Sequence, residues 1–212
     1  MNITVIGAGN MGSAFVKQLT RAGHQVSVTA RDFDKARQLA AANPGASAVA
    51  AADAAAAAGA DAVVLATGYG DALDALRSAG DVQGKVVIDI SNPLTADYTG
   101  LTISHDTSAA EEIVKAVPGA EVVKAFNTVF AQVLAEGANF GLGRKVTVFY
   151  ASDSERAKQT ARTLTESMGF ETMDAGGLKN ARYLEPLAGL NIYLGYGAGL
   201  GNSIAPTWIR KT

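Results

Sequence analysis

The chain has 212 residues, of which 48% are hydrophobic, and this is enough to bury one core. The formal net charge of −2 excludes a global basic field of the kind that attracts nucleic acid. The chain has no cysteine, which excludes disulfides, thiolate catalysis and cysteine-ligated metal. Apolar segments are too short to span a membrane and no basic leader is visible, so we expect a cytoplasmic protein without a membrane partner.

The first predicted strand, residues 3–6, runs directly into a glycine-rich turn, and an amphipathic helix is predicted over residues 13–21. At this spacing the first glycine permits a tight bend, the second lets the backbone approach a pyrophosphate, and the third lets the helix pack on the strand. The free N–H groups and the dipole of the helix N-terminus favour phosphate. The alternative is a tight strand-to-helix turn without a ligand. The motif predicts dinucleotide binding by Gly7, Ala8, Gly9, Asn10, Met11 and Gly12.

The end of the second predicted strand, residues 25–29, favours NADP over NAD. NAD-binding proteins place an acid there, whereas Arg31 can bind a 2′-phosphate bidentately and Lys35 can add a second positive charge. The four-residue spacing brings both side chains to one side of a helix that starts near Asp32. Two alternatives stay open: a solvated helix start with Asp32 as N-cap, or NAD binding.

Strands and helices then alternate along the chain. Near-continuous apolar strands separated by helices are typical of a sheet that is covered on both faces. We therefore predict a Rossmann-type, doubly wound α/β fold with a mainly parallel sheet and a short C-terminal helical segment, in which residues 1–174 form an NADP-binding domain. Further helices are expected at 33–42, 71–78 and 154–168, and further strands at 61–66, 86–90, 121–125, 145–150 and 170–173. Within the alanine-rich segment 48–60 we expect a short helix, with Asp53 as its N-cap and Gly59 as its C-terminal cap.

Polar residues follow three of the predicted strands, and ligands bind outside the carboxyl ends of such strands. Tyr69 can lie against a cofactor ring or ribose, or can cap the sheet. Asn92, in an Asn-Pro pair with Pro93, and Asn127 can donate or accept amide hydrogen bonds with a carboxamide or a second substrate. For Asn92 the turn-forming Asn-Pro pair is an equally good explanation, whereas a polar group after a buried strand favours function for Asn127.

Residues 175–212 are too few for a large helical substrate domain, so we expect this segment to complete the acceptor site. The segment contains a single acid, Glu185, and glycines that permit close approach to a flat ring or simply form a loop. Its excess of positive charge suits an anionic substrate or has no role. The bases are Lys179, Arg182, Arg210 and Lys211.

Acid–base candidates are scarce, and no catalytic residue or metal site is predicted. His24 lies in a turn far from the strand ends and is interpreted as structural, while His105 lies in a polar stretch that can approach the site. Hydride transfer between two cofactors requires orientation and exclusion of water, and no proton shuttle, so the absence is consistent with such a reaction.

Taken together, these motifs resemble the deazaflavin-dependent NADP reductases, which move hydride between NADP and 8-hydroxy-5-deazaflavin, the coenzyme F420. The resemblance covers nearly the whole chain. It is carried by Val5–Gly12, Ala30-Arg31 with Lys35, Asp174–Leu178 with Asn180 and Arg182, and the glycine-rich end.

The resemblance implies that the residues from Ala8 to Met11 contact the pyrophosphate and that Arg31 and Lys35 contact the 2′-phosphate. It further implies cofactor contacts by Tyr69 and Leu73, and by Ala125 near the nicotinamide. The family forms homodimers in which the C-terminal segment helps to build the deazaflavin pocket.

The chain departs from the family pattern at two positions near the site. Ala30 stands where the family often has serine, and Asn127-Thr128 stand where some members have a His-Thr pair. We predict an NADP-dependent oxidoreductase that transfers hydride to or from a deazaflavin or a flavin-like acceptor such as FMN. The alternatives are a reductase of a small imine or carbonyl compound and a nonenzymatic NADPH-binding sensor.

Overall fold

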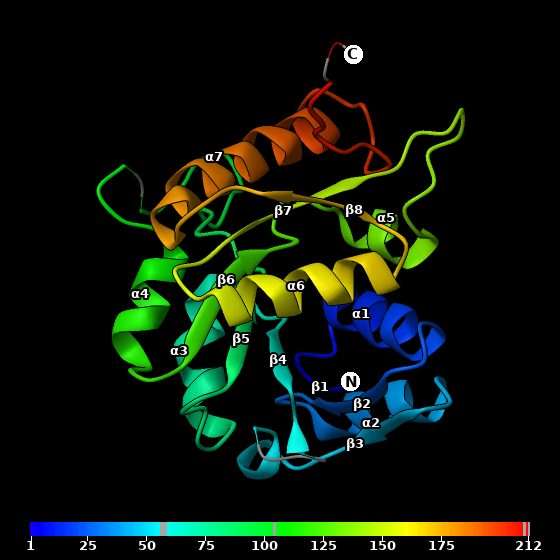
Figure 1. The fold of residues 1–212 in the computed structure, drawn as a ribbon, viewed down its shortest axis with the longest axis vertical. Coiled ribbons are helices and arrows are strands. Elements are labelled where there is room, and N and C mark those ends of the chain that lie inside the picture. The colour runs from blue at the N-terminus through cyan, green and yellow to red at the C-terminus, as the bar shows by residue number, and fades with distance from the viewer. Residues whose placement is uncertain (56–58, 104, 210, 212) are drawn as a thin grey trace.

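A single sheet forms the centre of the computed structural model, which describes residues 1–55, 59–103, 105–209 and 211 (Figure 1). Its strands lie in the order β3-β2-β1-β4-β5-β6-β7-β8. All neighbours pair in parallel except β6 and β7, which are antiparallel. The strands are β1 (Asn2–Ile6), β2 (Gln25–Thr29), β3 (Ala46–Ala48), β4 (Ala62–Leu65), β5 (Val86–Asp89), β6 (Glu121–Ala125), β7 (Thr147–Ala151) and β8 (Glu171–Asp174).

Helices cover both faces of the sheet, which confirms the predicted Rossmann-type, mainly parallel fold (Figure 1). The α-helices are α1 (Asn10–Arg21), α2 (Phe33–Ala41), α3 (Tyr69–Ser78), α4 (Ala109–Ala116), α5 (Ala131–Glu136), α6 (Glu155–Ser167) and α7 (Ala181–Ile192). The elements η1 (Ala51–Asp53) and η3 (Leu178–Asn180) are short 3-10 helices. The element η4 (Tyr193–Gly197) is a π-helix that extends α7. None of the described helices is long and apolar enough to cross a membrane.

Two apolar cores lie on opposite faces because strand side chains alternate between the faces. On β5, Val86 and Ile88 pack with α1, α2, α5 and α6, whereas Val87 packs with α3 and α4. The same alternation on β6 places Lys124 on the second face, between the apolar positions Val123 and Ala125 of the first. A charged side chain is therefore placed in a fully buried layer.

Several elements differ from the sequence-based expectation. The antiparallel direction of β7 was not predicted; Ala125 pairs with Tyr150, so the chain enters β7 from beyond the carboxyl end of β6. The intervening helix α5 has 6 residues, about 9 Å of helix, which is too short to return the chain to the amino end of β6. The short edge strand β3 and the helices α4 and α5 were also missed. A signal for α4 is present in the sequence, since Ser108 caps it and pairs with Glu111 three residues later.

The short helix expected between Asp53 and Gly59 is wrong for the part that the structure describes. Asp53 is the last residue of the 3-10 helix η1 rather than a helix N-cap, and Ala54 and Ala55 form a turn. Alanine-rich sequence favours a helix, but the following chain, through Ala55, packs instead as a turn against Ala79. Residues 56–58 lie outside the described residues.

The structural interpretation of His24 agrees with its contacts. Its imidazole is buried, with Nδ1 3.2 Å from the Met1 ammonium and Nε2 2.9 Å from Ser167 Oγ. Burial lowers the pKa of His24, and the nearby terminal charge lowers the same pKa further. β8 ends at Asp174, where the predicted first domain ends; the division into domains at this residue stays a prediction.

Candidate cofactor-binding site

The turn between β1 and α1 requires glycine at two positions because the backbone packs on itself there. Gly7 has a φ of +119°, and a Cβ at this position would lie 2.4 Å from the carbonyl oxygen of Ala66. A Cβ at Gly12 would lie 1.9 Å from the Gly7 carbonyl oxygen. At Gly9 a Cβ would have no protein heavy atom within 4 Å. Gly9 thus leaves open space above the turn, where a ligand can approach the backbone.

Helix α1 begins directly at this open space and presents an uncompensated N-terminus. No side chain caps the N-terminus at Gly9, and no acidic residue lies in the first turn. The first N–H groups of a helix have no intrahelical partner, and the helix dipole adds partial positive charge there. The turn and the helix end therefore present N–H groups and positive potential of the kind that phosphate groups prefer.

Arg31 extends into solvent just beyond the end of β2. Its side chain is 90% exposed, and Nη1 lies 3.5 Å from Asp71 Oδ1 in the first turn of α3. Lys35 Nζ lies 3.6 Å from Asp32 Oδ2, and Asp32 caps α2, as the alternative of a solvated helix start also requires. Exposed ion pairs of this kind contribute about 0–1 kcal/mol, so a phosphate dianion can displace the aspartates at small cost.

Buried polar atoms without a partner gather at the carboxyl edge of the sheet. Among the described residues, six buried side-chain oxygens accept or donate no hydrogen bond, and one of these, Asp89 Oδ2, is 2.6 Å from the Lys124 ammonium. The residues that carry the other five either form the last position of β2 or lie within three residues after the end of β4, β5 or β6. They belong to Thr29, Thr67, Ser91, Asn127 and Thr128. Because buried polar groups in proteins are normally satisfied, this row of atoms indicates a ligand along the edge.

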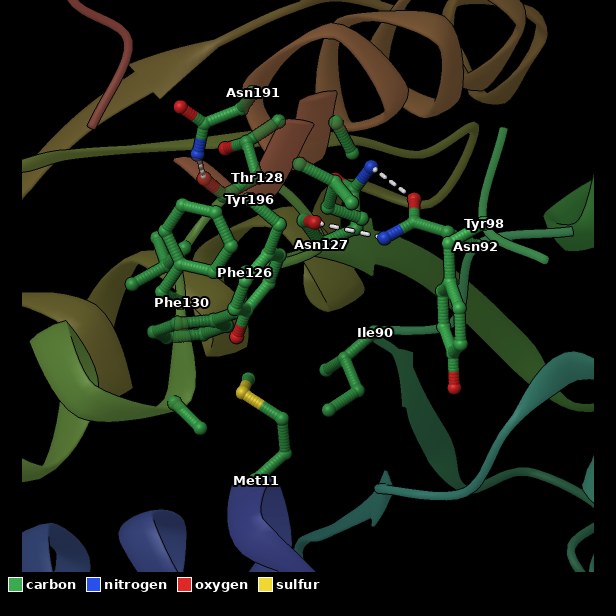
Figure 2. A pocket seen from close by; sticks show the side chains of 14 residues that line it. Met11, Ile90, Asn92, Tyr98, Phe126, Asn127, Thr128, Phe130, Asn191 and Tyr196 are labelled. Carbon is green, nitrogen blue, oxygen red and sulfur yellow. Dashed lines mark hydrogen bonds between the residues drawn. The ribbon is translucent and has the colours of Figure 1, made fainter. Parts of the chain in front are cut away.

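A cavity of about 180 Å³ lies at the end of this row, between the carboxyl ends of β5 and β6, the start of α1 and the C-terminal helix (Figure 2). It brings together three of the predicted site residues, Met11, Asn92 and Asn127. Figure 2 shows Met11 and Ile90 on one side and the amides of Asn92 and Asn127 facing each other. The further lining residues include Tyr98, Phe126, Thr128, Phe130, Asn191 and Tyr196.

The backbone at Phe126 adopts an unusual conformation where β6 meets the cavity. Its φ is +59° although the residue is bulky and fully buried, and its ring packs edge-on against Phe15 at 5.0 Å between centroids. Such a conformation costs free energy and persists only when the surroundings enforce it, most often at functional sites. It ends the strand and turns Asn127 toward Asn92.

A larger hollow of about 710 Å³ adjoins this cavity and shares Tyr98, Ile192 and Tyr196 with it. Tyr193 and Asp97 complete the aromatic and charged part of its lining. Tyr196 stacks edge-on against Phe130, with 5.6 Å between the ring centroids. The hollow therefore offers phenol rings on several sides, and such rings bind flat aromatic ligands well.

A buried ionic cluster supports the cavity from behind. Lys124 Nζ lies 2.6 Å from Asp89 Oδ2, 2.8 Å from Glu185 Oε1 and 2.7 Å from the Ser91 carbonyl oxygen, and all three charged side chains are almost inaccessible to solvent. Asp89 and Lys124 are directly opposite each other in β5 and β6. Glu185 also accepts hydrogen bonds from the first N–H groups of α4, those of Ala109 and Ala110.

Burial raises the pKa of Glu185, while the Lys124 ammonium and the Ala109 N–H act in the opposite direction. The cluster contains two carboxylates and one ammonium, so the helix N-terminus of α4 supplies the remaining positive potential. The cluster ties the sheet edge, α4 and α7 together at one point.

The other predicted contacts occupy different positions around the edge. Tyr69 and Leu73 lie one turn apart on α3, and burial raises the pKa of Tyr69, with Glu112, Glu185 and Asp89 contributing in the same direction. Ala125 is fully buried at the end of β6, and Pro93 is buried with its carbonyl bonded to Thr102. None of these four lines the 180 Å³ cavity, and their contacts with a cofactor stay predictions.

Of the basic residues of the C-terminal segment, Arg182 is used within the protein. Arg182 is held in a fork by both carboxylate oxygens of Glu111, at 2.9 and 2.7 Å, and also donates to the His105 carbonyl. Arg210 lies outside the described residues. His105 is exposed and lines neither the cavity nor the adjoining hollow. No group of three or more His, Asp or Glu side chains in the described part of the chain could hold a metal ion.

Sequence reasoning missed the ionic cluster and the aromatic lining. A signal for the cluster exists, because Asp89, Lys124 and Glu185 interrupt otherwise apolar segments, and charges in such segments are rarely buried unless paired. The aromatic side chains of Tyr98 and Tyr196 lie in loops and in the π-helix, where no periodic pattern predicts their direction.

Comparison with known proteins agrees with this geometry. The family model described as NADP oxidoreductase, coenzyme F420-dependent, matches residues 2–93. The F420-dependent NADP reductase of Methanothermobacter thermautotrophicus is 32% identical, in an alignment that covers 100% of this chain and 95% of that protein. The chain belongs to the F420-dependent NADP reductase family. It is thus a member of a family of NADP-dependent oxidoreductases, and the orphaned atoms and the open turn fit a bound NADP.

Two further proteins extend the family comparison. The crystal structure of a candidate F420-dependent NADP reductase from Arthrobacter sp. FB24 superposes with a TM-score of 0.84 at 31% identity, covering 94% of this chain and 96% of that one. Metalloreductase STEAP3 of Rattus norvegicus is 27% identical over 87% of this chain. The chain spans only 36% of the length of STEAP3, so this likeness concerns one part of that protein.

Alanine substitutions at Gly9 and Gly12 should separate ligand contact from packing. Gly9→Ala meets open space, so its unfolding free energy should stay within about 0.5 kcal/mol of wild type while NADPH affinity falls. Gly12→Ala meets the Gly7 carbonyl and should lose about 1–3 kcal/mol of stability. Urea denaturation and NADPH titration measure both quantities. Unchanged NADPH affinity in Gly9→Ala would contradict the site.

Replacing Lys124 by methionine should destabilise the protein by about 3–5 kcal/mol, because two carboxylates would stay buried without their ammonium. Lys115→Met is the matched control, since Lys115 pairs with Glu112 at 2.7 Å on the surface and should cost no more than about 1 kcal/mol. Denaturant unfolding of both variants gives the comparison. Equal losses would show that the buried cluster does not support the fold.

Proposed function

We propose that this family member transfers hydride between NADP(H) and a deazaflavin or flavin-like acceptor, in the cytoplasm and as a homodimer. The observation that carries the proposal is the row of unpartnered buried oxygens. The row runs from Thr29 at the end of β2, past the glycine turn, to the cavity between β5 and β6. A dinucleotide spanning this edge would satisfy these atoms. The proposed cofactor contacts are those of the sequence analysis, from the Gly7–Gly12 turn to Asn127.

The two hollows suit two different rings. The cavity of about 180 Å³ has room for a single ring such as nicotinamide, whereas the adjoining hollow of about 710 Å³ has room for a tricyclic acceptor. Tyr98 and Tyr196 border both spaces, so the two rings would meet between them. When bound, NADPH supplies a hydride from the nicotinamide ring. The chain binds and orients both rings, and α7 with η4 covers them from water.

The homodimer is supported by the distribution of exposed apolar side chains. Most of the large ones lie in the C-terminal segment, at the same end of the molecule as the adjoining hollow. Large exposed apolar groups that gather in one segment mark interaction surfaces. They are Tyr183, Leu190, Tyr193, Tyr196, Leu200, Trp208 and Ile209.

Reduction of a small imine or carbonyl compound is the second candidate. Such a reduction requires a proton donor, and the phenol groups of Tyr98, Tyr193 and Tyr196 border the hollow. A small imine is therefore included among the acceptors to be tested.

Arg31→Ala should weaken NADPH binding by at least about tenfold and leave NADH binding unchanged, because only NADPH carries the 2′-phosphate. Arg37→Ala is the matched control: Arg37 is an exposed arginine in α2 and also pairs with an aspartate, Asp34, at 3.4 Å. Isothermal titration with both dinucleotides measures the effect. Equal losses for NADPH and NADH would rule out this role of Arg31.

The acceptor is identified by following NADPH oxidation through the absorbance of reduced nicotinamide. Three acceptors are tested in parallel: 8-hydroxy-5-deazaflavin, FMN and a small cyclic imine. NADH in place of NADPH is the control. We expect the deazaflavin to be reduced fastest. Turnover with the imine alone would favour the second candidate. Tight NADPH binding without turnover of any acceptor would overturn the proposed reaction and favour a sensor.

A further inference from the structure

Two hydrogen bonds join Asn92 and Asn127 beside the cavity (Figure 2). Asn92 Nδ2 donates to the backbone carbonyl oxygen of Asn127 at 2.9 Å, and Asn127 Nδ2 donates to the side-chain oxygen Asn92 Oδ1 at 3.0 Å. Asn127 Nδ2 donates a second hydrogen bond to the Leu184 carbonyl oxygen, also at 2.9 Å. Both N–H bonds of the Asn127 amide are thus used within the protein.

The orientation of the Asn127 amide follows from its partners. The Leu184 carbonyl oxygen can only accept a hydrogen bond, so the amide atom beside it must be the nitrogen. The same argument with the Asn127 carbonyl fixes the nitrogen of Asn92, and its oxygen then faces the Asn127 nitrogen. Asn127 Oδ1 remains; it is buried and has no partner, in a residue that is only 6% exposed.

The ionic cluster holds the segments on both sides of this pair. Asp89 Oδ1 accepts the Ser91 N–H at 2.9 Å and Lys124 binds the Ser91 carbonyl, so the residue before Asn92 is fixed at both backbone groups. Leu184 directly precedes Glu185, which Lys124 also binds. A flip of the Asn127 amide would place its oxygen against the Leu184 carbonyl and lose two hydrogen bonds. The free oxygen is therefore kept as an acceptor.

We propose that Asn127 is a specificity-determining residue that accepts a hydrogen bond from an N–H group of the bound ligand. The neighbouring unpartnered hydroxyl of Thr128 can donate or accept and so tolerates either type of ligand atom, whereas Asn127 Oδ1 can only accept. A ligand that presents a methyl group or a lone pair there leaves the oxygen buried and unsatisfied, which weakens binding. The inference rests on the proposed function, since it assumes that a ring binds in this cavity.

Two ligand groups have the required chemistry: the carboxamide N–H of nicotinamide and the imide N–H at N3 of a deazaflavin. The first is tested by the dissociation constants of NADPH and of its reduced 3-acetylpyridine analogue, in which a methyl group replaces the amide nitrogen. The second is tested by the binding of 8-hydroxy-5-deazariboflavin and its N3-methyl derivative to the protein saturated with NADP⁺. In one of the two pairs, we expect the wild-type protein to prefer the N–H form by about tenfold or more.

Asn127→Leu, which preserves the shape of the side chain, should reduce that preference to within about twofold, because the acceptor is absent. Asn191→Leu is the matched control: Asn191 lines the same cavity and donates to the Thr128 carbonyl at 3.1 Å, but it contributes no unpartnered buried oxygen, so the preference should persist. Thermal unfolding establishes that both variants fold.

The wild-type protein alone already decides the proposal, even where a variant fails to fold. The proposal would be overturned by two results together. The dissociation constants of NADPH and its acetylpyridine analogue would differ by less than about twofold, and the two deazaflavins would bind equally or not at all. A preference that persists in folded Asn127→Leu would also overturn it. Failure to bind NADPH at all would instead contradict the proposed function, so the two failures are distinguishable.

Discussion

The ammonium of Lys124 is the point on which the arrangement of the site depends. Strand alternation places it on the same face of the sheet as Val87, in a buried layer. There it contacts the carboxylates of Asp89 in β5 and Glu185 in α7, and the Ser91 carbonyl oxygen that follows β5. Removing a charge from water costs several kcal/mol, which only close pairing with complete hydrogen bonding offsets. The two carboxylates and the N-terminus of α4 provide that pairing.

This arrangement joins two parts of the chain that are distant in sequence. The sheet brings Asp89 and Lys124 together through parallel pairing, and Glu185 comes from the C-terminal helix that follows the last strand. With Glu185 fixed, the next turns of α7 place Ala188, Asn191 and Ile192 over the cavity. The cavity is therefore a consequence of how the C-terminal helix is attached to the sheet, and the buried cluster is a major part of that attachment.

The contrast between satisfied and unsatisfied polar atoms separates structure from function in this molecule. The charges of the buried cluster pair with one another, and the His24 contacts and the cap of α4 use their hydrogen-bonding groups within the protein. Apart from Asp89 Oδ2, which pairs with Lys124, the unpartnered side-chain oxygens of the described residues lie along the carboxyl edge of the sheet, where a doubly wound fold binds its ligands. The strained backbone of Phe126 lies at the same edge.

Local sequence is sufficient to locate the glycine turn and the strand end from which the first half of the candidate site is built. The Gly7–Gly12 turn is readable because each glycine has a steric or ligand-contact reason at a fixed spacing, and Arg31 follows a strand whose end is easily located. The reversed direction of β7 was not readable, because it follows from a connection through the short helix α5, for which the sequence carries no clear local pattern. The cluster around Lys124 and the fixed orientation of the Asn127 amide depend on contacts across 35 or more residues, which no local pattern encodes.

In the proposed complex, one dinucleotide extends along this edge, from the guanidinium of Arg31 past the glycine turn to the cavity beside Asn127. The decisive experiment is a crystal structure with NADP⁺ bound. We expect the 2′-phosphate against Arg31, the pyrophosphate over Gly9 and the nicotinamide ring in the cavity that Met11 and Asn127 line. A nicotinamide ring outside that cavity, or an adenosine end remote from Arg31, would contradict it.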